Sequence, residues 1–330
     1  MASHDVLTDP LKAPPTIDEI RQAHRRIEGV VHRTPTATCT GLNALAAAKL
    51  IFKCENLQKV GAFKARGAAN AVLSLPDEVA ARGVATHSSG NHAAALAWAA
   101  RRRGISAHIV MPSNAPAAKR AAVEGYGAQV FECAPTLEAR ELVLAEVVER
   151  THAEFIHPYD DPRVLAGQGT AVLELCEQCP DLDIVMAPVG GGGLCSGTAI
   201  SAAALPHGPK IVGAEPAQAD DARRGLLEGR LIGPENPTTI ADGLRTALSP
   251  LTFGVLQSLG VEILTASEAT ISRAMRLLWE RAKLLVEPSA AVPFAAVLEH
   301  QERFHGLRVG IILSGGNADL DHLPWLDRAT

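Results

Sequence analysis

The chain has 330 residues, which is enough for one large α/β unit or for two lobes with a sizeable core. Hydrophobic residues make up 47% of it, charged residues 20%, and the formal net charge is -5. This balance is that of an ordinary soluble protein, without the basic excess that nucleic acid or an anionic membrane surface attracts. No apolar run reaches the roughly 18 residues that a membrane span needs. Neither nucleic acid nor a membrane is therefore expected as a partner.

Cysteine usage and the start of the chain indicate a reducing compartment. The six cysteines are widely scattered, and the start, MASHDVLTDP, has neither a basic segment nor the apolar stretch of a secretory signal. A cytoplasmic location is therefore expected. Cys176 and Cys179 form a CEQC pair, but no second pair or histidine cluster lies near them in the sequence. We interpret them as core-facing thiols of one helix rather than as a zinc or redox site.

Capping and hydrophobic patterns predict the first elements. Residues 1–15 contain three prolines and predict a flexible arm. Thr16 and Glu19 form a capping box, in which each side chain satisfies a free backbone amide of the other residue, and the helix that begins there should end near Glu28. The segment ALAAAKL (44–50) predicts a second helix, and LIFKCE (50–55) predicts a short buried strand.

From about Gly83 onward, strand and helix patterns alternate regularly. Alternation at these lengths predicts parallel strands joined by right-handed crossovers. We predict a small domain of residues 83–158, inserted into a large domain formed by 1–82 and 159–330. The predicted strands are 84–89, 107–112, 128–133, 154–158, 183–189, 210–216, 261–266 and 308–314. The predicted helices are 91–104, 115–127, 136–152, 168–179, 194–204 and about 267–283.

Four short glycine or hydroxyl motifs follow one another along this pattern. GAFKARGA surrounds Lys64, whose ammonium loses hydration among small apolar neighbours, so this lysine is either structural or chemically used. SSGNH (88–92), VGGGGL (189–194) and SGGN (314–317) each come after a strand-like run, where an open α/β sheet places ligand-binding turns. The backbone amides of the four glycines in VGGGGL can surround an anion at a helix N-terminus. The alternative is that these glycines form only a tight turn between a strand and a helix. Four successive glycines cost too much backbone entropy for that purpose alone.

Together these four motifs resemble the fold-type II pyridoxal phosphate enzymes, specifically the serine/threonine dehydratase and serine racemase family. The resemblance runs from about Ile17 to the end of the chain, with the motifs in the family's order. It implies an α/β fold like that of the tryptophan synthase beta chain, with two open, twisted, mostly parallel sheets in a large and a small domain. It also implies pyridoxal 5'-phosphate as cofactor.

The resemblance assigns the cofactor site residue by residue. Lys64 would hold the cofactor aldehyde as a Schiff base and, once displaced by substrate, remove the Cα proton. Phe63 would pack beside the ring, and Asn91 would bond the phenolic oxygen. Ser314 would face the pyridine nitrogen, and its hydroxyl would leave that nitrogen largely unprotonated, which favours prompt loss of a β-leaving group. The phosphate would lie on the loop of Gly190, Gly191, Gly192, Gly193 and Leu194.

The substrate carboxylate, by the same resemblance, would bind to the SSGNH loop. Ser89 matches the serine of racemases and hydroxyaspartate dehydratases, where it acts as an acid or base on the face opposite the lysine. The side chain of His92 is given no chemical role. The residues assigned to substrate are Ser88, Ser89, Gly90, Asn91 and His92.

A further match concerns a divalent cation. In EPAQADD (215–221) the family's ligands would be Glu215, the carbonyl of Ala219 and Asp221, and such oxygen donors suit Mg²⁺, Ca²⁺ or Mn²⁺. The alternative is that these acidic residues only complement a helix dipole. The sequence IADGLR around Asp242, together with Glu287, matches positions that line the cofactor side of the cleft. Val60 and Gly61 replace the family's commoner Thr-Gly-Ser run before Phe63, a departure that alters the substrate wall.

The predicted function is a pyridoxal phosphate-dependent ammonia-lyase. It would convert serine, threonine or threo-3-hydroxyaspartate to a 2-oxo acid and ammonia. The alternative within enzymes is a serine, aspartate or hydroxyaspartate racemase with dehydratase side activity, and the alternative outside them is an idle amino-acid-binding homologue. An NAD-binding protein is excluded because VGGGGL is not GxGxxG and lacks the ribose-binding acid. A homodimer is expected from the resemblance alone.

Overall fold

The computed structural model describes residues 13–326, in which two separate sheets carry the fold. The predicted flexible arm lies mostly outside these residues. The larger sheet has the strand order β1-β2-β10-β7-β8-β9, and every neighbouring pair is parallel except β1 with β2. Its strands are β1 (Thr36–Ala37), β2 (Lys49–Lys53), β7 (Ile184–Pro188), β8 (Lys210–Pro216), β9 (Glu262–Ala266) and β10 (Arg308–Ile312).

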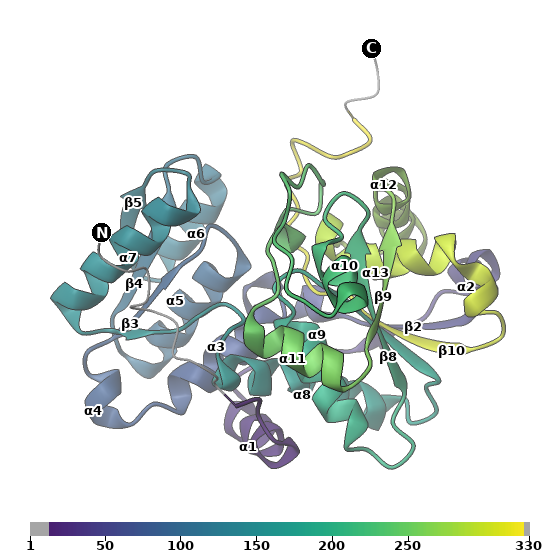
Figure 1. The fold of residues 1–330 in the computed structure, drawn as a ribbon, viewed down its shortest axis with the longest axis horizontal. Coiled ribbons are helices and arrows are strands. Elements are labelled where there is room, and N and C mark those ends of the chain that lie inside the picture. Colours follow the sequence, from purple (N-terminus) through teal and green to yellow (C-terminus); the bar gives the residue numbers. More distant parts are fainter. Residues whose placement is uncertain (1–12, 327–330) are drawn as a thin grey trace.

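The smaller sheet forms the lobe on the left of Figure 1 and is parallel throughout, in the order β5-β4-β3-β6. Alternate residues of a strand face opposite sides of the sheet. In β4 Ile109 and Met111 therefore pack with the helix of residues 91–103, while Val110 packs with that of residues 137–151. The strands are β3 (Val84–His87), β4 (Ala107–Pro112), β5 (Gln129–Cys133) and β6 (Glu154–Phe155).

The helices connect and cover the two sheets. The first begins with the predicted capping box: Glu19 N donates to Thr16 Oγ1 at 3.3 Å, and Thr16 N donates to Glu19 Oε2 at 2.7 Å. The α-helices are α1 (Ile17–Ile27), α2 (Thr40–Ala46), α3 (Lys64–Leu73), α4 (Asp77–Ala80), α5 (Asn91–Arg103), α6 (Ala117–Gly125), α7 (Leu137–Thr151), α8 (Pro162–Gln178), α9 (Gly193–Ala203), α10 (Asp221–Glu228), α11 (Pro250–Ser258), α12 (Glu268–Leu277) and α13 (Pro288–Glu299). Short 3-10 turns are η1 (Glu55–Leu57), η2 (Lys59–Gly61), η3 (Asp242–Leu244) and η5 (Gln301–Arg303), and η4 (Leu278–Ala282) is a π-helical turn that continues α12.

Several sequence-based expectations about elements were wrong or incomplete. The helix predicted at 168–179 begins earlier, at Pro162, and α4 and α11 were not predicted. The predicted helix at 44–50 lies earlier, at Thr40–Ala46, because Ala47 adopts a left-handed conformation (φ 50°) and the chain from Lys49 pairs with β10. Helix α13 was not predicted because Pro293 lies inside it, and an internal proline argues against a helix. Cys176 and Cys179, by contrast, pack against the core from the end of α8, as predicted.

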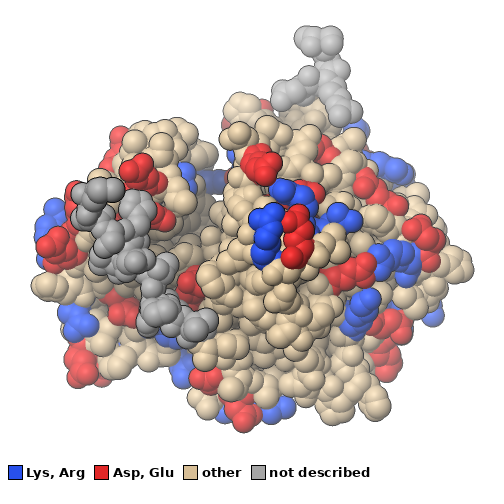
Figure 2. Space-filling model, in the orientation of Figure 1, with Lys and Arg blue, Asp and Glu red and all other residues tan. Residues whose placement is uncertain are grey.

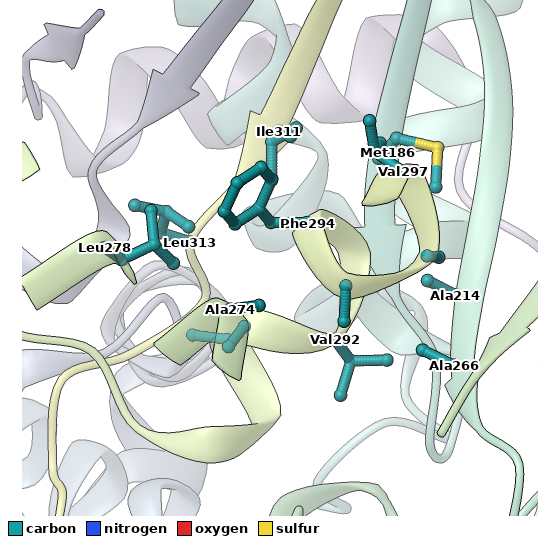
Figure 3. Close-up of a cluster of buried hydrophobic side chains, with 14 of the residues drawn as sticks. Met186, Ala214, Ala266, Ala274, Leu278, Val292, Phe294, Val297, Ile311 and Leu313 are labelled. Carbon is teal, nitrogen blue, oxygen red and sulfur yellow. The ribbon is translucent and has the colours of Figure 1, made fainter. Parts of the chain in front are cut away.

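Helix α13 occupies the centre of the large lobe. Its buried residues pack against one face of the larger sheet, and Phe294 meets Phe52 of β2 edge to face, with ring centroids 5.8 Å apart. Figure 3 shows Phe294, Val297 and Met186 converging at this interface. Helices α8 and α9 cover the opposite face. The sheet is therefore buried on both sides, which explains why its strands are almost continuously hydrophobic.

The division into domains stays a proposal. All four strands of the smaller sheet fall within the predicted range 83–158. However, Ala68, Ala71 and Val72 of α3 belong to the core cluster that α5 and the smaller sheet also form. Helix α3, which begins at Lys64, thus packs against both lobes through α5 and α8. Any movement between the lobes would act on the helix that carries Lys64.

The surface of the molecule carries charges of both signs, and it is hollowed between the two lobes in the view of Figure 2. Within residues 13–326, no helix combines the length and the apolar character that crossing a bilayer requires. Apart from β1, the strands of each sheet are parallel, so their carboxyl ends meet at one edge, and the motif loops follow there. Ser88 follows β3, Gly190 follows β7 and Ser314 follows β10.

Candidate active site

Lys64 is the first residue of α3 and lies partly buried between the lobes. Its Nζ donates to the carbonyl of Pro158 at 2.8 Å and lies 5.1 Å from the centre of the Phe63 ring. No acidic side chain contributes to its titration, so burial alone lowers the pKa of Lys64 from the ordinary 10.5 to about 8. A lysine with such a pKa is unprotonated in about a tenth of the molecules at pH 7, far more than an ordinary lysine, and a nucleophile or base must be unprotonated to act.

The loop before Lys64 is anchored to the loop after β10. Phe63 N donates to the carbonyl of Ser314 at 2.9 Å, and Asn317 Nδ2 donates to the carbonyl of Val60 at 2.9 Å. Val60 has φ 55°, a strained conformation for a β-branched residue. Gly61 is required beside it, because a Cβ there would lie 2.5 Å from Asn317 Oδ1. At the positions where the sequence departs from the family's commoner run, Val60 and Gly61 thus both have left-handed backbone conformations.

Asn91 joins the two lobes through its side chain. Asn91 Nδ2 donates to Glu287 Oε1 at 2.8 Å, and Asn317 Nδ2 donates to Asn91 Oδ1 at 2.8 Å. Burial, reinforced by the charge of Asp242, raises the pKa of Glu287 to about 8. Glu287 is therefore largely neutral at pH 7 and adds little negative charge to the site. Ser314 is 2% exposed and adjoins this cluster through Gly315, whose Cβ would lie 2.3 Å from Glu287 Oε1.

The glycine loop presents buried amides that have no partner. The backbone N–H groups of residues 190–194 donate to no acceptor within residues 13–326, although all five residues are buried. These loop positions have no room for a residue with a side chain. A Cβ on Gly191 would lie 2.3 Å from the Tyr159 ring, and a Cβ on Gly192 (φ 82°) would lie 2.5 Å from Leu248 Cδ2. Buried amides almost always find a partner. The loop thus has the donors for an anion at the N-terminus of α9.

The SSGNH loop forms a second set of free amides at the N-terminus of α5. Gly90 N is bonded to Ser88 Oγ at 3.2 Å, whereas the amides of Ser89, Asn91 and His92 have no acceptor in the part of the chain that the structure describes. These three donors converge at a helix start, which favours a carboxylate there. The side chain of His92 is buried and points inward, where its Nε2 lies 3.2 Å from the carbonyl oxygen of Ile156.

Beneath the lysine lies a buried ion cluster that sequence reasoning missed. Arg66 bonds Glu55 at 2.7 and 2.8 Å and Glu174 at 2.7 and 2.8 Å. Lys53 bonds Glu174 at 2.7 Å, so two positive and two negative side chains balance. All four are buried. Because they come from β2, η1, α3 and α8, no local spacing could have indicated that they meet.

The predicted cation loop contains two buried carboxylates. Glu215 accepts the amides of Ala222 (3.1 Å) and Arg223 (2.8 Å), which is the helix-capping arrangement that the sequence left as an alternative. Asp221 Oδ2, however, is buried and has no hydrogen-bond partner. Burial raises the pKa of both carboxyl groups. Residues 13–326 contain no cluster of three or more His, Cys, Asp or Glu side chains suited to a metal, and the predicted set, with one carbonyl, is not of that kind.

Two further residues near the cleft were not singled out from the sequence. Tyr159 packs against Gly191 and Gly193 of the glycine loop. Arg140, on the first turn of α7, has a buried Nε without a hydrogen-bond partner, and its charge helps to lower the pKa of His87, the residue before Ser88. Arginines are frequent in this chain and have no distinguishing spacing, so only the fold could separate Arg140 from the others.

Comparison with known proteins bears on this arrangement of loops. A family model described as pyridoxal-phosphate dependent enzyme matches residues 27–315. The chain belongs to this family. Beta-hydroxyaspartate dehydratase of Paracoccus denitrificans (strain Pd 1222) is 50% identical to it over 311 residues, which cover 94% of this chain and 99% of that protein. Serine racemase of Dictyostelium discoideum is 47% identical over 312 residues, with 93% and 96% covered.

The solved structures agree with the fold. Maize serine racemase superposes on this pyridoxal-phosphate dependent enzyme with a TM-score of 0.92 and 45% sequence identity, covering 94% of this chain and 95% of that one. The predicted fold class is thereby confirmed. The family and the cofactor class predicted from the four motifs are confirmed as well.

The depressed pKa of Lys64 leads to a pH prediction for uptake of the cofactor. Only the unprotonated amine attacks an aldehyde, so the rate constant should rise about tenfold per pH unit up to pH about 8 and then level off. For an amine with the ordinary pKa of 10.5, the rate constant would continue to rise beyond pH 10. Stopped-flow absorbance of apoprotein mixed with pyridoxal phosphate measures this rate. Nα-acetyl-lysine in the same buffers corrects for titration of the aldehyde, and a protein profile parallel to that control would contradict the prediction.

Proposed function

We propose that this enzyme is an ammonia-lyase that removes water from a β-hydroxy-α-amino acid, with 3-hydroxyaspartate as the preferred substrate. The substrate loses its β-hydroxyl as water, and hydrolysis of the resulting enamine gives a 2-oxo acid and ammonia. The observation that carries the proposal is the placement of Lys64 beside two loops with unpartnered amides. Lys64 bonds Pro158, whose neighbour Tyr159 packs against the glycine loop, and its charge acts on His92 of the SSGNH loop. The first loop suits a phosphate and the second a carboxylate. The 50% identity to beta-hydroxyaspartate dehydratase supports the choice of substrate.

The residues present fit pyridoxal phosphate. The amides of Gly190, Gly191, Gly192, Gly193 and Leu194 would hold the phosphate, which would satisfy five buried donors at once. Lys64 would hold the cofactor, with Phe63, Asn91 and Ser314 around the ring. When bound, the cofactor withdraws electrons from the substrate Cα and thereby acidifies its C–H bond.

Lys64 and Ser89 would carry the proton transfers. Lys64 takes the Cα proton from one face, and its lowered pKa keeps the base form available near neutral pH. Ser88 and the amides of Ser89, Asn91 and His92, with Gly90 between them, would fix the substrate carboxylate. Ser89 would then face the opposite side of Cα. A serine at this position also supports racemisation as the second candidate function. The 47% identity to a serine racemase supports it as well.

A divalent cation would bind to Glu215, the carbonyl of Ala219 and Asp221. The unpartnered, buried Asp221 Oδ2 and the raised pKa of both carboxyl groups support this, since a cation would compensate two charges that burial disfavours. The cation would order the loop after β8 rather than contact substrate. Homodimer assembly and a cytoplasmic location also stay predictions of the sequence.

Arg140 would bind the second carboxylate of 3-hydroxyaspartate. Its unpartnered Nε and its influence on His87 support a position beside the SSGNH loop. Arg140→Met should lower kcat/KM for 3-hydroxyaspartate about 10- to 100-fold, since a hydrogen bond to a charged group is lost, and should leave L-serine nearly unchanged. Arg150→Met, at the last turn of the same helix, is the matched control. Equal losses of kcat/KM for both substrates would show that Arg140 does not bind the side-chain carboxylate of the substrate.

The first experiment measures ammonia release from L-serine, D-serine, L-threonine and the isomers of 3-hydroxyaspartate, with Mg²⁺ and with chelator. Chiral chromatography of the remaining amino acid measures racemisation in the same reactions. Preference for 3-hydroxyaspartate is the expected result. Preference for serine or threonine would make the enzyme a general dehydratase, and enantiomer exchange without ammonia would favour the racemase. A protein that binds the cofactor but changes no substrate would refute catalysis altogether.

A further inference from the structure

His92 is held in one tautomer by its surroundings. Its Nε2 lies 3.2 Å from the carbonyl oxygen of Ile156, which also accepts the hydroxyl of Thr86 at 2.9 Å. A carbonyl oxygen can only accept, so Nε2 must carry the hydrogen of the neutral ring. The ring stays neutral because burial, together with the charge of Lys64, lowers the pKa of His92 to about 3. Nδ1 therefore presents a lone pair at every pH at which the enzyme works.

This lone pair has no use within the fold. His92 is 2% exposed, and its Nδ1 is buried with no hydrogen-bond partner in the described part of the chain. A buried acceptor left unpaired costs free energy, and such groups in native proteins usually have a functional reason. Phenylalanine or leucine would fill this space without that cost. The donor for Nδ1 should therefore be one that the resting arrangement does not supply.

Lys64 is a cation that lies near enough to His92 for its charge to lower the pKa of the imidazole. The imidazole bonds the carbonyl of Ile156, and the Lys64 ammonium bonds the carbonyl of Pro158 at 2.8 Å. These carbonyls are two residues apart on the segment that leaves β6, and His92 titrates under the influence of the Lys64 charge. An ammonium has three N–H donors, and Pro158 takes one of them.

We propose that His92 is a positioning residue for Lys64: its Nδ1 accepts a hydrogen bond from the Lys64 ammonium when that group holds the substrate Cα proton and has left the Pro158 carbonyl. The inference rests on the proposed role of Lys64 as base. In that step the Cα–H bond breaks, an N–H bond forms on Nζ, and the electron pair stays on the substrate. His92 orients the ammonium and does not take its proton, because the imidazole is by far the weaker base.

Two substitutions separate this role from a merely structural one. In His92→Asn the amide oxygen can take the place of Nδ1, but the side chain is too short to reach Ile156. In His92→Gln the amide nitrogen can still donate to Ile156, but no acceptor stands in the place of Nδ1. We expect His92→Gln to lose about 10- to 100-fold in kcat with KM unchanged, and His92→Asn to keep most of kcat. A structural role predicts the reverse order. Any result in which His92→Asn is not the more active variant overturns the proposal.

A spectroscopic measurement tests the same contact without turnover. L-Alanine lacks a leaving group, so it can occupy the loaded enzyme and release Lys64 from the cofactor without elimination. In ¹⁵N-histidine-labelled holoenzyme, the His92 Nδ1 resonance should stay that of an unprotonated nitrogen and should shift when L-alanine changes the cofactor absorbance. A resonance that L-alanine does not move refutes the contact. This outcome is independent of whether the enzyme is a lyase, because no β-hydroxyl takes part.

Discussion

Replacing Lys64 with alanine is expected to lower ammonia release by about 10⁴-fold, because one substitution removes both the covalent anchor of the cofactor and the base at Cα. Phe63, the residue before Lys64, donates its amide to the carbonyl of Ser314, and the charge of Lys64 contributes to the lowered pKa of His92 in the SSGNH loop. Among residues 13–326, the lysine nearest to Lys64 in sequence is Lys59, which belongs to η2 and not to the motif around Lys64. The measurement is ammonia release per cofactor bound, after saturation with pyridoxal phosphate.

A control and a rescue separate lost chemistry from lost folding. Lys49→Ala, at the exposed start of β2, removes a lysine far from the motif loops and should leave activity unchanged. Millimolar methylamine should restore part of the activity of Lys64→Ala by supplying an external base. Retention of more than about 1% of the activity without added amine would contradict the assignment of Lys64 as the base.

Arg66→Leu is expected to reduce the free energy of unfolding by about 3–5 kcal/mol. The substitution removes one partner of a buried ion pair and leaves Glu55 and Glu174 with uncompensated charge, which is far more costly than losing a surface pair. Lys53 balances only one of the two carboxylates. Urea unfolding of the apoprotein measures the change. Because Arg66 is two residues from Lys64 on α3, uptake of the cofactor should weaken as well.

The matched control is Arg276→Leu. Arg276 bonds Glu280 at 2.7 Å, but both side chains are about half exposed, so the loss should stay within about 0.5 kcal/mol. Arg66→Lys keeps the positive charge but loses the planar guanidinium that bonds two carboxylates at once. Its loss in the free energy of unfolding should lie between those of Arg66→Leu and Arg276→Leu. If Arg66→Leu were no more destabilising than Arg276→Leu, the buried cluster would not be a major source of stability.

The sequence predicted those parts of the fold that rest on local patterns. Alternating strands and helices from Gly83 onward, the capping box at Thr16 and the loops after three strands are all local signals, and the structure has them. The order of the strands in the larger sheet was not predicted, because the pairing of β2 with β10 depends on contacts between the two ends of the chain. Helix α13 was missed because Pro293 overrides its hydrophobic pattern locally.

The candidate site was predictable where it consists of short motifs. The residues that the structure adds come from distant segments: Arg66 meets Glu174 across 108 positions, and Asn91 meets Glu287 across 196. Long-range pairs such as these leave no periodic trace in a single sequence. The role proposed for His92 was missed for a different reason. A histidine in the first turn of a helix indicates only packing until the contacts of its two ring nitrogens are seen to differ.

The position of β10 at the centre of the larger sheet has a consequence for biosynthesis. Its neighbours β2 and β7 are synthesised early and midway through translation. The two strands cannot become part of one sheet until β10, which lies between them, has left the ribosome. The smaller sheet, whose strands all lie between Val84 and Phe155, is complete long before then. Domains that are finished first fold first, and long-range pairing is slow. Ser314 arrives with that last strand, so the nascent chain should acquire its ability to retain pyridoxal phosphate only at the end of synthesis.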